Sequence, residues 1–372
     1  MSVERLSEKL PSRWLALFAM LSAAAASAWT WAHVNAVRSS PADAYLTIGR
    51  TGPHEQVITK GYRPIVSPGG RVYFARDVDW VDASGQVYSC MVDGSSESIV
   101  QLVPPVRFAC RLGEMSFSQD PPRCYLNYYV LDVGEYFGEG VLEAPDRLRI
   151  LVRDLPAVRG GWAYVSRDGR LCVHLVKPTG RRSYWALATL GSGGAAGPPL
   201  WAPDPVRGPI HFYGDWAPGS GRFAFSNAGG GRKWMVEGYP LDVLDVRRRV
   251  LTDEYKIPGA SVEAMAWSPD GRWIAFHVDM VEPPDSPMFY AVCVLDLSSG
   301  RAWRLSQCVG CPQWSPDMAY LVYERDGFIF RLDWRAALAD KAQEVPMKHK
   351  RLDVGPQPPA KTGKGARSRD SG

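Results

Sequence analysis

A short turn motif recurs along the chain at a nearly constant interval, and it limits the fold more than any other feature. Its clearest copy, Ser268-Pro269-Asp270-Gly271, lies between the apolar segments AMAW and RWIAF. Proline fixes φ, aspartate can bond its own backbone and glycine accepts positive φ, so the motif reverses the chain between two strands. Six copies, spaced by 47 to 51 residues, begin at Ser67, Ser118, Ser166, Ala217, Ser268 and Ser315. A constant period with a constant structural role predicts a repeat architecture.

Each repeat has room for four short strands. Around the clearest copy, apolar or alternating segments cover residues 263–267, 272–277, 289–297 and 302–306. One four-stranded sheet per repeat is the blade of a β-propeller. We therefore predict an all-β fold, a six-bladed β-propeller of four-stranded blades over residues 44–346. The alternative is a β-sandwich, or several small β domains, in which the turns coincide by chance.

A strand at the start of the ring is expected to close it. Residues 56–60 stand where a fourth strand would, just ahead of a turn motif, but no blade precedes them. The last repeat has only residues 319–323 and 327–332 after its turn. We predict that residues 56–60 complete the last blade, which removes a sheet edge that would otherwise be open to other chains.

The run WSPDGRWIAF, followed by VCVLDLSSGRAWRLS, resembles the PD40 (WD40-like) repeat of TolB-like six-bladed propellers. The resemblance covers most of residues 56–334 and is sharpest in the last two repeats. WD40 repeats are shorter, and Kelch repeats carry paired glycines that are not periodic here. The resemblance implies an interaction partner in a periplasmic envelope complex. It does not extend to TolB's separate N-terminal domain, in whose place we expect an anchor and a short linker, residues 35–43.

The N-terminal segment has the length and composition of a membrane anchor. Residues 1–13 are a weakly basic start that contains Arg5, Lys9 and Arg13. Residues 14–34 carry no charged side chain apart from His33. As a helix they would span about 31 Å, close to the ~30 Å of the hydrocarbon core.

A cleaved signal peptide is the alternative, because Ala26-Ser27-Ala28 is an A-x-A site after the apolar run. Tryptophans at both ends of the run instead suit the two interfaces of an anchor. In both cases the basic start stays in the cytoplasm, so we expect the propeller outside it. It would belong to a single-pass protein of the cell membrane, or be secreted or periplasmic after cleavage near Ala28.

Residues 347–372 differ from the ring in composition. From Lys348 onward there are seven lysines and arginines against two aspartates, and prolines and glycines leave little to bury. We predict a disordered basic tail. Such a tail can contact an anionic lipid or polymer, or simply remain solvated.

The seven cysteines have no framework spacing. Cys90, Cys172 and Cys293 fall within predicted strands and are expected to be small apolar core residues. Cys308 and Cys311 form a C-x-x-C pair between two strands, without the helix N-terminus of a redox motif or the further ligands of a zinc site. A local disulfide is the expected outcome.

Topology predicts where a partner would bind. We call the side of the ring that carries the turn motifs the turn face, and the opposite side the loop face. The loop face carries the connections between successive repeats and between the second and third strands, including the longer insertions. Loops placed by a rigid scaffold are where binding usually occurs. The candidate binding residues on this face are Asp77, Asp79, Asp82, His277, Asp279, Glu282 and Asp285.

No catalytic motif is recognisable, and no cofactor, metal or nucleic-acid partner is expected. The first three aspartates match a calcium loop only loosely, because Val81 offers no side-chain oxygen. We predict a non-enzymatic binding module, tethered outside the cytoplasm, that holds an envelope or periplasmic protein or a cell-wall component. The alternative is a propeller enzyme, a lyase or hydrolase acting on carbohydrate or peptide at the channel mouth.

Overall fold

The computed structural model describes most of the predicted ring. The described residues are 51–79, 84–103, 116–119, 122–130, 134–152, 163–176, 184–191, 196–202, 209–229, 239–280, 291–307, 310, 312–340 and 342–354. All of them belong to one compact unit, Thr51–Gly372. The expected anchor or signal segment and the linker lie outside the described residues. A search of the described part found no helix of the length and hydropathy needed to cross a membrane.

The described strands form six sheets. The first three, each given from its innermost strand outward, are as follows. The first contains β2 (Tyr62–Val66), β3 (Arg71–Asp79), β4 (Ser84–Met91) and β5 (Ser98–Ile99). The second contains β7 (Ser116–Gln119), β8 (Pro122–Val130), β9 (Gly134–Ala144), β10 (Arg147–Val152) and β6 (Gln101–Val103). The third contains β11 (Ala163–Val165), β12 (Leu171–Val176) and β13 (Tyr184–Thr189).

The other three sheets include the last strands of the chain. The fourth contains β14 (Pro209–Trp216), β15 (Arg222–Gly229), β16 (Leu241–Asp245), β17 (Val250–Lys256) and β26 (Lys348–Val354). The fifth contains β18 (Ala260–Trp267), β19 (Trp273–Met280), β20 (Ala291–Asp296), β21 (Arg301–Gln307) and β25 (Gln343–Val345). The sixth contains β22 (Gln313–Trp314), β23 (Leu321–Arg325), β24 (Phe328–Leu332) and β1 (Glu55–Lys60). A short helix, α4 (Trp334–Ala339), follows β24.

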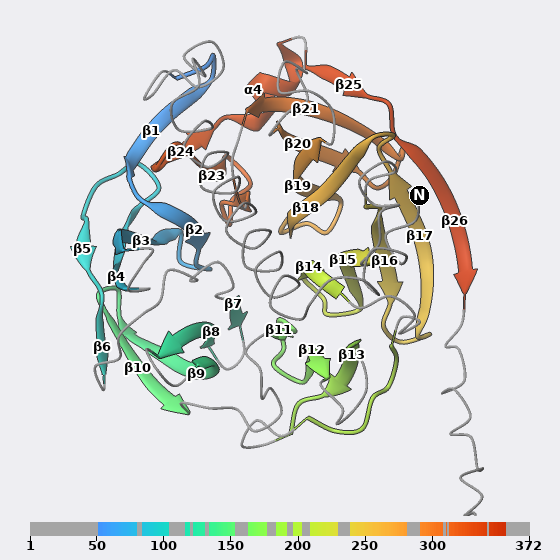
Figure 1. The fold of residues 1–372 in the computed structure, drawn as a ribbon. Helices are drawn as coiled ribbons and strands as arrows, with labels where there is room; N and C mark the ends of the chain where they lie inside the picture. Colours follow the sequence, from blue (N-terminus) through green and yellow to red (C-terminus); the bar gives the residue numbers. More distant parts are fainter. Residues whose placement is uncertain are drawn as a thin grey trace, which may run out of the picture. The chain divides into compact units, whose positions relative to one another are not determined.

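The sheets are arranged around a common centre, and the strand named first for each sheet above lies innermost (Figure 1). Innermost strands of successive sheets contact one another, as β11 does with β14, and β14 with β18. This arrangement is a β-propeller, so the predicted all-β fold is confirmed. The four strands predicted in the fifth repeat correspond to β18 to β21.

The prediction of six four-stranded blades was wrong in its count of complete blades and in its strand numbers. Among the described residues five sheets are complete blades, two with four strands and three with five, and the third sheet has three strands. Beyond β13 the described residues make isolated bridges, Leu187 with Trp201 and Leu190 with Ala196. The segment after β13 is rich in glycine and proline, which weaken a strand or remove its donors.

The turn motif repeats its hydrogen bonds as well as its sequence. In the fifth sheet the buried Ser268 hydroxyl donates to Asp270 at 2.6 Å and accepts from Trp273 N at 2.8 Å. Serines 166 and 315 make the same pair of bonds in their own turns. Gly271 has φ +70°, a conformation that side chains disfavour. The spacing of the motif therefore reflects one physical device used repeatedly.

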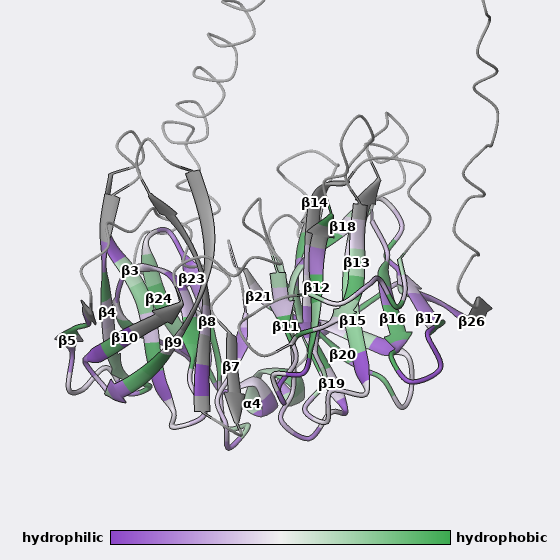
Figure 2. Cartoon of the chain, turned by 90° about the horizontal axis from the view of Figure 1, so that it is seen from below, coloured by the Kyte–Doolittle hydropathy of each residue, from purple (hydrophilic) through white to green (hydrophobic). Residues whose placement is uncertain are grey.

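Neighbouring sheets are joined by apolar packing and by indole hydrogen bonds. Side chains of β18 to β20 pack against the fourth sheet through residues such as Ile274, Phe276 and Val278, all fully buried. Trp216 Nε1 donates to the Tyr164 carbonyl, and Trp314 Nε1 to that of Ala266, each at 3.0 Å. In Figure 2 the apolar residues run along the strands, and polar residues mark the turns. Cys90, Cys172 and Cys293 are free and buried, as predicted, and burial raises the pKa of each thiol to about 12.

The predicted ring closure is confirmed. Strand β1 pairs antiparallel with β24, with Gln56 opposite Arg331 and Lys60 opposite Phe328. The sixth sheet is thus built from both ends of the ring, in the order β1-β24-β23-β22.

A buried ion pair holds β1 on one side. Glu55 Oε2 accepts from Arg325 Nη2 at 2.8 Å, and the two side chains are 1% and 9% exposed. The other Glu55 oxygen accepts from the hydroxyls of Ser306 and Tyr323. Burial raises the pKa of Glu55, but the hydrogen bonds from Arg325, Ser306 and Tyr323 outweigh it, so the pKa lies below its usual value. Since Ser306 lies on β21, the cluster also ties the sixth sheet to the fifth.

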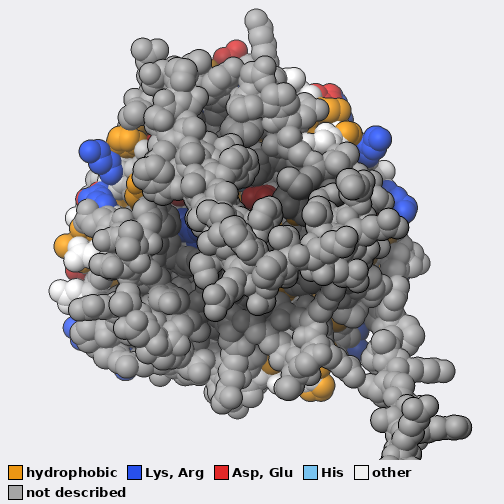
Figure 3. Space-filling model, viewed as in Figure 1, with side chains coloured by type: hydrophobic (Ala, Val, Ile, Leu, Met, Phe, Trp, Pro, Cys, Tyr) orange, Lys and Arg blue, Asp and Glu red, His pale blue; other side chains and the backbone are white. Residues whose placement is uncertain are grey.

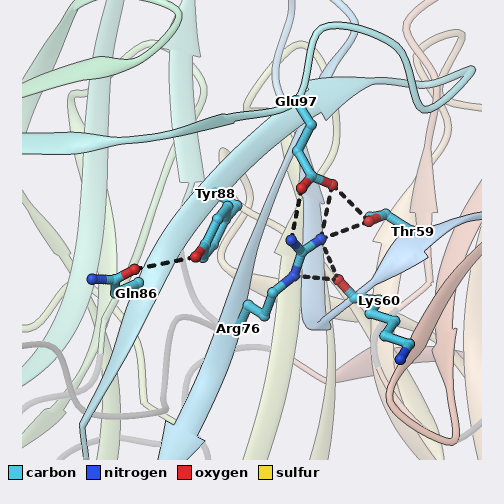
Figure 4. Close-up of polar contacts among 6 residues, drawn as sticks. All are labelled: Thr59, Lys60, Arg76, Gln86, Tyr88 and Glu97. Atoms are coloured by element: carbon cyan, nitrogen blue, oxygen red, sulfur yellow. Dashed lines mark hydrogen bonds and ion pairs between the residues drawn. The ribbon is translucent and has the colours of Figure 1, made fainter.

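A second charged cluster ties β1 to the first sheet (Figure 4). Arg76, on β3, donates to both carboxylate oxygens of Glu97, at 2.6 and 2.8 Å. Its Nη2 also donates to the Thr59 hydroxyl at 2.6 Å and to the Lys60 carbonyl at 2.9 Å. The guanidinium lies 4.5 Å from the centroid of the Tyr88 ring. Charged groups therefore hold strand β1 both to the rest of the sixth sheet and to the first sheet.

The first part of the predicted disordered tail is instead a strand. Lys348–Val354 form β26, which pairs antiparallel with β17, and Gln343–Val345 form β25 on the edge of β21. Acidic cross-strand partners explain why this basic segment forms a strand, since Lys350 lies opposite Glu254 and Arg351 opposite Asp253. Residues from 355 onward lie outside the described residues.

Candidate functional site

Four of the predicted binding residues lie near strand ends that point away from the turn motifs. Strand β18 ends and β19 begins at the turn motif, so the C-terminal end of β19 lies toward the opposite, loop face. Asp77 and Asp79 are within β3, and His277 and Asp279 are within β19. Among these four, only the side chain of His277 is described. Asp82, Glu282 and Asp285 lie outside the described residues, as do Cys308 and Cys311.

His277 is not the exposed histidine that its position in the sequence indicated. Its side chain lies within the β19 sheet and is 6% exposed. Burial lowers its pKa to about 4, so the imidazole is neutral at pH 7. The histidine is a core residue next to the loop face and offers no charge to a partner.

A buried carboxylate near the channel mouth was not predicted. Glu324, on β23, accepts a hydrogen bond from the backbone N–H of Arg63, on β2, at 2.8 Å. Burial raises its pKa to about 7, against the opposing effects of this hydrogen bond and of the Arg63 charge. Figure 3 views the ring from the loop face and shows acidic and basic side chains in a recess near its middle. The sequence signal was a glutamate that follows the apolar residues of the strand LVYER, next to Arg325.

The innermost strands are bent near this mouth. Arg63 and Ala264 have φ of +53° and +37°, and each stands four residues before the serine of its turn motif. The strand register shifts at both positions, between Tyr62 and Ile65 and between Glu263 and Met265. Positive φ in residues other than glycine is costly, so these are strained bulges that redirect the strands toward the loop face.

A second buried carboxylate serves the scaffold. Asp215, on β14, accepts from Trp267 N, on β18, at 2.8 Å and from Arg167 Nη2, in the turn after β11, at 3.0 Å. Burial raises the pKa of Asp215, and the Arg167 charge and backbone N–H groups oppose the rise. This carboxylate links three successive sheets, so its hydrogen bonds are made within the ring.

No group of three or more histidine, cysteine, aspartate or glutamate side chains within the described residues could hold a metal ion. The mouth therefore presents one carboxylate with a near-neutral pKa, beside an arginine in a strained backbone conformation. That arrangement can accept or donate a proton or bind a cationic or hydroxylated group.

Comparisons with known proteins identify the fold. No protein-family description matches the sequence, and no curated protein matches it. Among solved structures, TolB from Acinetobacter baumannii superposes with a TM-score of 0.50 at 13% identity, over 75% of this chain and 66% of that one. A putative TolB from Agrobacterium tumefaciens gives 0.47 at 15% identity, over 80% and 91% of the two chains. Periplasmic gluconolactonase from Pseudomonas aeruginosa gives 0.44 at 13% identity, over 80% and 86%.

The match to TolB from Acinetobacter baumannii supports the propeller fold seen in this chain. The names of the matched structures also include enzymes, such as an oligogalacturonate lyase from Vibrio parahaemolyticus. At such low identity the likeness defines the class of fold, a TolB-like β-propeller, and leaves the activity to be argued from this chain's own residues.

Proposed function

We propose that this chain is a non-enzymatic binding module that holds a protein or cell-wall component of the envelope on its loop face. The observation that supports this most directly is that polar side chains link neighbouring sheets into a ring. Connections from several of these sheets extend from the same side of the ring. Asp215 joins three sheets, and Glu55 and Arg76 clasp β1. A rigid scaffold that presents adjacent loops is suited to recognition.

The acidic residues of the loop face indicate the kind of partner that would bind there. Six acidic residues that the sequence predicts for this face lie in the last residues of β3 and β19 and in the connections that follow them, and residues 77–86 and 279–290 contain no lysine or arginine. The first and fifth sheets, which bear them, flank the sixth sheet on either side. A basic surface on the partner would complement this side of the loop face.

The test is affinity capture with the full-length protein in detergent from an envelope extract. The variant D279A/E282A/D285A removes three acidic groups from the loop face. D93A/D146A/D340A removes three from exposed or terminal turns elsewhere and matches the charge change. We expect a partner that the control variant retains and the loop-face variant loses. Equal retention by both variants contradicts the loop face, and an empty capture contradicts the binding module.

We further propose that residues 14–34 tether the ring to the membrane, with the ring outside the cytoplasm. Support comes from the uncharged run and from the basic residues before it. Mass spectrometry of the purified mature protein tests the tether. An intact N-terminus supports an anchor, whereas a chain that begins after Ala28 contradicts it and indicates a secreted or periplasmic protein.

The second candidate is an enzyme acting on carbohydrate or peptide at the channel mouth, and Glu324 is the observation that favours it. A carboxyl with a pKa of about 7 is suited to general acid–base catalysis at neutral pH. E324Q keeps the shape and removes the titration. If the protein cleaves any member of a panel of glycans and peptides, E324Q should abolish that cleavage. Cleavage that persists in E324Q excludes this residue.

A further inference from the structure

A polar pocket lies at the outer part of the fourth sheet, away from the channel mouth. It has a volume of about 540 Å³, within the range of small-molecule sites. Its walls come from β15, β16, β17 and β26 of the fourth sheet and from the turn between β20 and β21 of the fifth. Strand β26 thus contributes to a pocket as well as covering a sheet edge.

One wall is a fixed stack of two rings. The imidazole of His349, on β26, lies parallel to the phenol of Tyr255, on β17, with centroids 4.5 Å apart and 7° between the planes. His349 Nε2 is 2.8 Å from Asp253 Oδ1, which sets the orientation of the ring. Gly300, at φ +70°, lets the turn approach His349, since a Cβ there would lie 3.2 Å from Nδ1. The wall is therefore shaped by side chains that hold one another in place.

Two arginines give the pocket its charge. Arg222 is positioned by Trp267, whose ring centroid is 4.6 Å from the guanidinium carbon, and by a 3.0 Å bond from Nη2 to the Gly271 carbonyl. Arg351 comes from β26. Both arginines line the pocket together with Tyr255. Burial raises the pKa of Tyr255 to about 12, and the two guanidinium charges oppose that rise. Asp253 is the one carboxylate in the lining, and His349 already contacts it.

We propose that this pocket binds a small molecule through an oxyanion, a carboxylate or a phosphate group, held between Arg222 and Arg351. Guanidinium groups match both anions with paired hydrogen bonds. The volume of the pocket leaves room beside the two guanidinium groups for a body of about monosaccharide size. The site is separate from the loop face, so it stands or fails independently of the binding function proposed above.

Calorimetric titration of the full-length protein in detergent tests the site with three probes. Inorganic phosphate and glucuronate carry the two oxyanions, and glucose is the neutral control. We expect saturable binding of phosphate, glucuronate or both, and none of glucose. The probe that binds more tightly decides between the two oxyanions.

Variants connect the binding to the pocket. R351Q lies on an edge strand, and we expect it to raise the Kd roughly tenfold or more, as loss of a charge-assisted hydrogen bond does. R222Q should do the same, and its thermal melting reports any loss of packing against Trp267. R247Q, in the exposed turn between β16 and β17, is the matched control and should bind as the native chain does. Absence of binding by the native chain, unchanged Kd in both pocket variants, or equal loss in R247Q overturns the proposal.

Discussion

Two seams of this ring, one between neighbouring sheets and one within the closing sheet, are held by different forces. Where the fourth sheet meets the fifth, the contact is mainly apolar, with Ile274, Phe276 and Val278 fully buried, and Asp215 adds a hydrogen bond from Trp267 N. Where β1 joins the sixth sheet, the buried groups include the ions Glu55 and Arg325. The first seam joins consecutive repeats, and the second joins the two ends of the ring.

The difference reflects what each seam must specify. Apolar packing is non-directional and accepts small changes of shape, which is sufficient where the chain itself keeps two repeats adjacent. A strand that arrives from the far end of the sequence needs a defined register, and a buried ion pair supplies directional contacts. The same pair is costly to break, because removal of one partner leaves an unpaired buried charge.

The largest effect is expected from E55Q, which leaves Arg325 buried and without its counter-ion. We expect it to lower the free energy of unfolding by about 3 to 5 kcal/mol, measured by urea denaturation. E344Q removes the carboxylate of a half-exposed pair with Arg301 and is the control. Similar small effects of both changes would show that the closing seam does not depend on its ion pair.

A pH-dependent effect comes from the second buried carboxylate of the closing sheet. The pKa of Glu324 rises from 4.5 to about 7 on folding, so its contribution to stability is fully present below pH 4.5 and is lost as pH rises toward 7. The loss is on the order of 3 kcal/mol. E324Q should remove this part of the slope when unfolding is measured between pH 4.5 and 8. If the pH dependence of the unfolding free energy is the same in E324Q as in the native chain, a group other than Glu324 titrates in this range.

The apolar seam should respond weakly to a conservative change. I274V deletes one methyl group from a fully buried side chain, and we expect a loss of about 1 kcal/mol in unfolding free energy. A loss as large as that of E55Q would remove the contrast between the seams. Thermal unfolding of both variants, side by side, measures the difference.

The smallest effect is expected at the second clasp of β1. Arg76 and Glu97 are 24% and 33% exposed, so water and salt screen their interaction. R76K keeps the charge and loses the paired geometry, which should cost about 0.5 kcal/mol, and less at high salt. A cost that is larger and independent of salt would indicate that packing over Tyr88 dominates.

The sequence predicted those parts of the ring that rest on local chemistry. The turn motif fixed the repeat period, because each serine and aspartate bonds only within its own turn. Closure by β1 followed from a strand without a blade of its own. Glu55 and Arg325 are 270 residues apart, so no local pattern could join them. The strand β26 was hidden by a basic composition whose acidic partners, on β17, lie about a hundred residues earlier in the chain.

The candidate site was predicted less well than the fold. Topology indicated the loop face, but His277 is buried and Glu324 was not foreseen. Both outcomes depend on desolvation by neighbouring strands, which composition and spacing do not report. The pocket beside β26 was also invisible, because it is formed by residues from strands far apart in the chain.

Ring closure by β1 is the central claim, and a cross-link tests it most directly. Gln56 and Arg331 are register partners on β1 and β24. Opposite residues of an antiparallel pair have Cα atoms about 4.5 or 5.5 Å apart, within disulfide range in either case. The variant Q56C/R331C, oxidised and digested, should yield a peptide joined between these positions, and Q56C/R351C should not. Absence of that cross-link from the first variant, or its equal formation in the second, would contradict the closure.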